Sequence, residues 1–62
     1  MGWRREIREL IAQLEQQRSR LEDVRERARK QGGSEGERLE KQAGARLRDI
    51  DRRINALQAS LE

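Results

Sequence analysis

Few side chains in this chain could do chemistry, and almost all of them are charged. The 62 residues include no histidine, cysteine or tyrosine, and neither Gly-x-Gly-x-x-Gly nor a P-loop pattern occurs. Asp49 and Asp51 form a pair of carboxylates, but a spacing of two residues directs them to different faces of a helix. Asp49 is better spaced to pair with Arg52 or Arg53. We therefore expect no enzyme activity, no metal site and no cofactor.

Arginine is the second chemical feature. The chain has 15 basic residues, mostly arginine, against 12 acidic ones, and a net charge of +3. Asp23 and Asp49 are spaced to neutralise neighbouring arginines, and Trp3 is the only aromatic residue that could stack on a base. We expect local ion pairing, and we keep polyanion binding as an alternative. The candidate residues for polyanion binding are four arginines on one flank of the heptad pattern described below: Arg20, Arg27, Arg46 and Arg53.

Two amphipathic helices would carry these side chains. The chain is 32% apolar and 44% charged, has no proline, and is rich in residues that favour helices. Apolar residues recur every three or four positions on both sides of a glycine pair, with Gln17 in one vacant slot. Such a narrow stripe is typical of a coiled-coil seam. Its members are Trp3, Ile7, Leu10, Leu14, Leu21, Val24 and Ala28 in the first half and Ala43, Leu47, Ile50, Ile54, Leu57 and Leu61 in the second.

The segment between the two stripes carries signals that end one helix and begin another. Gly32 or Gly33 can adopt the left-handed conformation that terminates a helix. Ser34 and Glu37 match a capping box, with Ser34 as N-cap of the next helix. A turn this short favours antiparallel neighbours. We predict one domain, 1–62, with a helix at about 3–31, a turn at 32–34 and a second helix at about 35–61.

One register pairs almost every apolar residue of the two stripes. If the chain reverses around Gly32, facing residues have numbers that add up to about 64, which places Trp3 against Leu61 at the open end. The fold class that follows is all-α, an antiparallel two-helix coiled-coil hairpin. Gly44 either allows another backbone to approach closely, which we favour, or is a weak point in the second helix. Gln17 either fixes the register or lies at the edge of the seam.

A hairpin of this size leaves half of each seam residue in contact with water. Ile11 and Leu39 widen the apolar surface beyond a two-stranded seam, which favours a dimeric four-helix bundle over a monomer. We expect the chain itself to be the main partner. The predicted core and self-association residues are Trp3, Ile7, Leu10, Ile11, Leu14, Leu21, Val24, Ala43, Leu47, Ile50, Ile54, Leu57 and Leu61.

The C-terminal stretch resembles segments of two unrelated families. LRDIDRRINALQASLE is similar to the opening helix of the all-helical chorismate mutases, with different spacing, and to the dimerisation helices of MerR-type regulators. Because these families share no chemistry, the double resemblance is typical of a generic amphipathic helix and identifies neither family. The residues that carry the first resemblance are Leu47, Arg48, Ile50, Asp51, Ile54 and Leu57.

The function predicted from these features is assembly: a structural or oligomerisation module without catalysis. The alternatives are a nucleic-acid-binding bundle and an adaptor or co-chaperone hairpin that packs against a helix of another protein. No apolar run reaches the roughly 20 residues of a membrane span, so we expect a soluble protein, cytoplasmic if bacterial. Met1-Gly2-Trp3 and Leu61-Glu62 leave open an engineered or truncated chain, beside natural termini.

Overall fold

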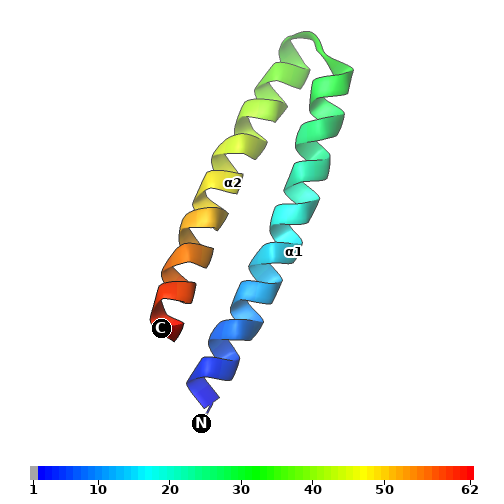
Figure 1. Cartoon of the computed structure of the whole chain (residues 1–62). Coiled ribbons are helices and arrows are strands. Elements are labelled where there is room, and N and C mark those ends of the chain that lie inside the picture. Colours follow the sequence, from blue (N-terminus) through cyan, green and yellow to red (C-terminus); the bar gives the residue numbers. More distant parts are fainter. Residues whose placement is uncertain (1) are drawn as a thin grey trace.

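The chain folds into two long helices joined by a single residue. The computed structural model describes residues 2–62; Met1, part of the N-terminal stretch considered above, lies outside the described residues. Helix α1 spans Gly2–Gln31 and helix α2 spans Gly33–Leu61, and the two lie side by side and antiparallel (Figure 1). The backbone measures 50 by 14 by 11 Å along its principal axes. The all-α hairpin predicted from the two heptad stripes is confirmed.

The reversal is tighter than the predicted turn at 32–34. Between the two helices only Gly32 lies outside a helix, and Gly33 and Ser34 are already part of α2. The φ angles of Gly32 and Gly33 are 70° and 71°, values that residues with a Cβ rarely adopt. The Gly32 amide donates a hydrogen bond to the Ala28 carbonyl, and the Gly32 carbonyl accepts one from the Gly36 amide. The donor–acceptor distance is 3.2 Å in both. One residue therefore closes the last turn of α1 and the first turn of α2.

The capping box predicted at Ser34 and Glu37 is not formed. The N-cap of α2 is Gly32, which has no side chain to donate or accept. Within residues 2–62, no side-chain hydrogen bond involves Ser34 or Glu37. The physical reason is that two successive glycines with positive φ turn the chain at once, so α2 begins before the serine and leaves its hydroxyl inside the first turn.

The core is a thin apolar layer between the helices. Ile11, Ile50 and Ile54 form a buried cluster, and half-buried residues pack around it. No polar or charged side chain is buried among the described residues. The buried apolar residues are Ile11, Ala28, Ala43, Leu47, Ile50 and Ile54, and those packed against the cluster are Ile7, Leu14, Leu21, Leu57 and Leu61.

The seam of α1 differs from the predicted one. Trp3, Leu10 and Val24 are exposed, so their placement between the two helices is wrong. The less exposed residues of α1 instead recur at positions 7, 11, 14, 18, 21, 25 and 28. This places Ile11 in the seam together with two half-buried arginines, Arg18 and Arg25. The predicted layer of Trp3 on Leu61 does not bury Trp3, which is 51% exposed, and the N-terminal end of α1 extends past the end of α2 (Figure 1).

Close approach of the two backbones occurs at Gly36, near the turn, and not at Gly44. A Cβ atom at Gly36 would lie 2.6 Å from the carbonyl oxygen of Ala28, whereas a Cβ at Gly44 would meet nothing within 4 Å. Within the hairpin, Gly44 therefore does not serve a close approach of the other helix. Ala28 and Ala43 are each 3% exposed, so small residues line this end of the interface and allow the helices to meet.

Candidate self-association surface

Three cavities adjoin on one side of the hairpin and form a continuous groove. The central cavity shares Gln17 and Arg53 with the cavity towards the open end, and it shares Leu21 and Arg46 with the cavity towards the turn. Their volumes are about 390, 390 and 150 Å³. We call this side the groove face; its lining residues are Leu10, Gln13, Leu14, Gln17, Arg20, Leu21 and Val24 of α1 and Leu39, Gln42, Ala43, Arg46, Asp49, Ile50, Arg53, Ala56 and Leu57 of α2.

Large apolar side chains on the groove face remain in contact with water. Leu10, Val24 and Leu39 are 48%, 45% and 38% exposed. Leu10 lines the cavity near the open end, and Val24 and Leu39 line the cavity near the turn. Trp3, 51% exposed, is one heptad before Leu10, and the Arg4 guanidinium carbon lies 5.4 Å from its ring centroid. These residues were predicted as core or as its border, and the hairpin leaves them uncovered.

The opposite side of the hairpin is polar and pairs its own charges. Arg18 Nη1 lies 3.1 Å from Asp51 Oδ1, and Arg29 Nε lies 3.1 Å from Glu40 Oε2, so both ion pairs join α1 to α2. We call this side the ion-pair face. Its cavity, of about 500 Å³, contains no apolar side chain and is lined by Arg25, Arg29, Glu37, Glu40, Lys41, Gly44 and Arg48.

Arg18 and Arg25, the two half-buried arginines of α1, occupy seam positions that border the ion-pair face. The aliphatic part of an arginine can cover apolar surface while its guanidinium group stays in water. Arg18 does this, because its side chain is 38% exposed and reaches Asp51. Exposed ion pairs contribute only about 0.2–1 kcal/mol each, but they satisfy the charges at the helix boundary. Sequence reasoning missed both arginines, since a charged residue at a seam position carries no apolar signal.

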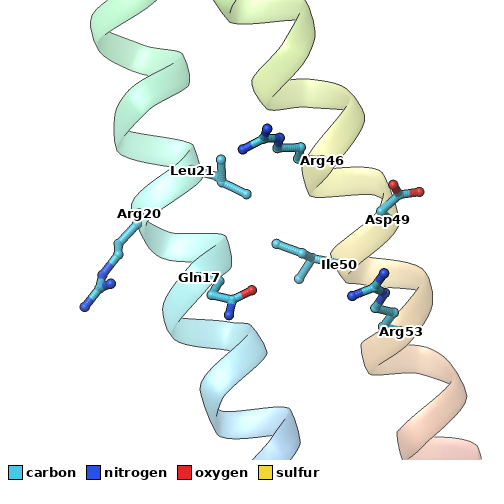
Figure 2. Close-up of a pocket in the computed structure, with 7 residues that line it drawn as sticks. All are labelled: Gln17, Arg20, Leu21, Arg46, Asp49, Ile50 and Arg53. Carbon is cyan, nitrogen blue, oxygen red and sulfur yellow. The ribbon is translucent and has the colours of Figure 1, made fainter.

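Three of the four arginines predicted as polyanion contacts line the groove face. Arg20, Arg46 and Arg53 border the central cavity, whereas Arg27 borders none of the cavities described above. Figure 2 shows Arg46 and Arg53 directed into the space between the helices, and Arg20 directed away from α2. Arg20 and Arg46 therefore do not face each other across the hairpin, although they share one flank of the heptad pattern.

Gln17 lies on the groove face and not in the seam. It is exposed, it lines the central cavity together with Leu21 and Ile50, and its side-chain amide points from α1 towards α2 (Figure 2). The vacant heptad slot of the sequence is thus the middle of the groove. A glutamine there supplies a donor and an acceptor to whatever covers it.

Other kinds of site are not found in the described part of the chain. Within residues 2–62, no group of three or more histidine, cysteine, aspartate or glutamate side chains could hold a metal ion. Neither helix combines the length and the apolar character needed to cross a bilayer. Comparison with known protein families, curated proteins and solved structures finds no match for this chain.

Proposed function

We propose that this chain is a non-catalytic self-association module in which two hairpins pack through their groove faces into a four-helix bundle. The observation that carries the proposal is the exposure of Leu10, Val24 and Leu39 on the same side of the hairpin, above a floor of half-buried leucines. Leu10 lies towards the open end of the groove face and Val24 and Leu39 towards the turn, so large apolar side chains are exposed along much of its length. Exposed apolar surface gathered on one side of a soluble protein marks an interaction site.

The surface area of the hairpin supports a partner of its own size. The accessible surface is 5208 Å², whereas a compact monomer of 7.3 kDa is expected to expose about 4,200 Å². The backbone of one broad side projects onto a rectangle 50 Å long and 14 Å wide, about 700 Å², which is the same order of size as the roughly 800 Å² of accessible surface that each partner contributes to a standard interface. A second copy has the same length and the same apolar stripe, so it covers the groove from end to end.

The proposal is tested by sedimentation equilibrium over a dilution series, with helicity followed by circular dichroism. We expect the wild type to sediment as two chains at micromolar concentration. Leu10→Glu and Val24→Glu place a charge in the covered groove and should give one chain. The matched control is Asn55→Glu, an exposed position on the helix surface next to the ion-pair face, which should still sediment as two chains.

Two results would contradict self-association. One is a fully helical single chain at every concentration. The other is a poorly helical single chain that gains helicity only when another protein is added, which would favour the adaptor hairpin instead.

A further inference from the structure

The middle of the groove face carries positive charge that is directed into the groove. Arg46 and Arg53 extend from α2 and the Gln17 amide extends from α1, all towards the central cavity of about 390 Å³ (Figure 2). Leu21 and Ile50 form its apolar floor. The site therefore combines two guanidinium groups, one side-chain amide and a floor that supplies no counter-charge.

No carboxylate in the described residues neutralises these two guanidinium groups. Arg46 and Arg53 make no ion pair within residues 2–62. Asp49, the one acidic residue that lines the cavity, points away from it in Figure 2 and lies 3.9 Å from Arg52. By contrast, Arg18 and Arg29 on the ion-pair face each reach a carboxylate at 3.1 Å. The groove face thus carries two guanidinium groups that form no ion pair with the described residues of their own chain.

Dimerisation would enclose this charge. The central cavity lies near the middle of both helices, because Gln17 is central in α1 and Arg46 is central in α2. In a two-fold bundle the centre of one groove meets the centre of the other, whether the two turns lie at the same end or at opposite ends. Four guanidinium groups then surround one space. Removing unpaired charges from water costs several kcal/mol each, so an empty centre would oppose assembly.

We propose that this centre binds a multivalent oxyanion of the phosphate or short polyphosphate class between the two copies, and that the anion strengthens the dimer. The proposal rests on self-association through the groove face. Guanidinium groups match phosphate oxygens with two parallel hydrogen bonds, and the Gln17 amide can donate another. Arg46 and Arg53 are seven residues apart, about 10.5 Å along the helix, which suits an anion that spans both side chains.

The experiment measures the dimer dissociation constant by sedimentation equilibrium at one ionic strength in three buffers: chloride, inorganic phosphate and pyrophosphate. An anion that binds only the dimer lowers this constant by a factor that grows with the ratio of the anion concentration to the anion's own dissociation constant, and we expect about tenfold or more in pyrophosphate relative to chloride. The double variant Arg46→Gln, Arg53→Gln should still dimerise but lose the response. Arg48→Gln, Arg52→Gln changes two exposed arginines outside the groove lining and should keep it.

Each other outcome overturns the anion site, and the outcomes are distinguishable. A dimer with the same dissociation constant in all three buffers, or with the same response in the double variant, refutes the anion site and leaves self-association intact. A single chain in every buffer refutes both. A duplex RNA, added as a fourth arm, identifies a nucleic-acid surface if it binds the wild type but not the double variant while pyrophosphate leaves the dimer unchanged.

Discussion

Gly36 and Gly44 lie on the same helix, eight residues apart, and serve different purposes. Gly36 contacts the backbone of α1, where a Cβ would meet the Ala28 carbonyl oxygen at 2.6 Å. Gly44 borders the cavity of the ion-pair face, and a Cβ there would meet nothing within 4 Å. The sequence alone could not separate them, because whether a glycine is needed depends on the opposing backbone and not on its neighbours in sequence.

We predict opposite effects of alanine at these two positions. Gly44→Ala should raise the free energy of unfolding by about 0.5–1 kcal/mol, because alanine restricts the unfolded chain and favours the helix. Gly36→Ala should lower it by about 1–3 kcal/mol, because the helices must move apart. Thermal unfolding followed by circular dichroism measures both, at about 4–8 °C per kcal/mol for a domain of this size. The helix-propensity gain is similar in both variants, so stabilisation by both would contradict the close contact at Gly36.

The hairpin could be predicted from individual residues, but the residues that form its turn and its helix cap could not. Gly32 and Gly33 do reverse the chain, as their position between two heptad stripes indicates. Ser34 and Glu37 match a capping motif equally well, yet the motif is not used. Local sequence offers both solutions. The positive φ of two consecutive glycines decides between them.

At the scale of the element, α1 carries two overlapping stripes and α2 carries one. The stripes of α1 share Ile7, Leu14 and Leu21; one adds Leu10 and the other adds Ile11. The sequence favours the first stripe because its added positions include more large apolar residues. The structure uses the second for the hairpin, with arginine stems completing the seam. The α2 residues of the predicted core all lie buried or half-buried, because α2 offers no competing stripe.

We predict that the neighbouring residues Leu10 and Ile11 separate folding from assembly. Ile11→Ala removes a side chain that is 8% exposed in the core cluster and should lower the free energy of unfolding by about 2–3 kcal/mol. Leu10→Ala should leave the helical content unchanged and raise the dimer dissociation constant. Circular dichroism and sedimentation equilibrium on the same samples measure the two effects. A larger loss of helix in Leu10→Ala than in Ile11→Ala would contradict the seam assigned to α1.

At the scale of the whole molecule, the hairpin is a rod with two unlike broad sides. The ion-pair face joins its own helices through Arg18 to Asp51 and Arg29 to Glu40, whereas the groove face leaves leucine and arginine side chains open. Neither side is visible as such in the sequence, because each combines residues from both helices and depends on their rotation. The apolar core of a single hairpin is only a thin layer between the two helices. A partner that covers the groove face therefore enlarges this core.

This division of the surface predicts that thermal stability depends on protein concentration. When a folded dimer unfolds to two separate chains, mass action raises the midpoint as concentration increases. With about 2.1 cal/mol/K of unfolding entropy per residue over two chains, the midpoint should rise by about 5 °C for each tenfold increase. Val24→Glu should remove this dependence, because its single chains unfold without dissociating, and Asn55→Glu should retain it. Circular dichroism melts over a hundredfold concentration range measure the slope. A wild-type midpoint that stays constant over that range would mean that the hairpin is stable alone and that its apolar groove remains open to water.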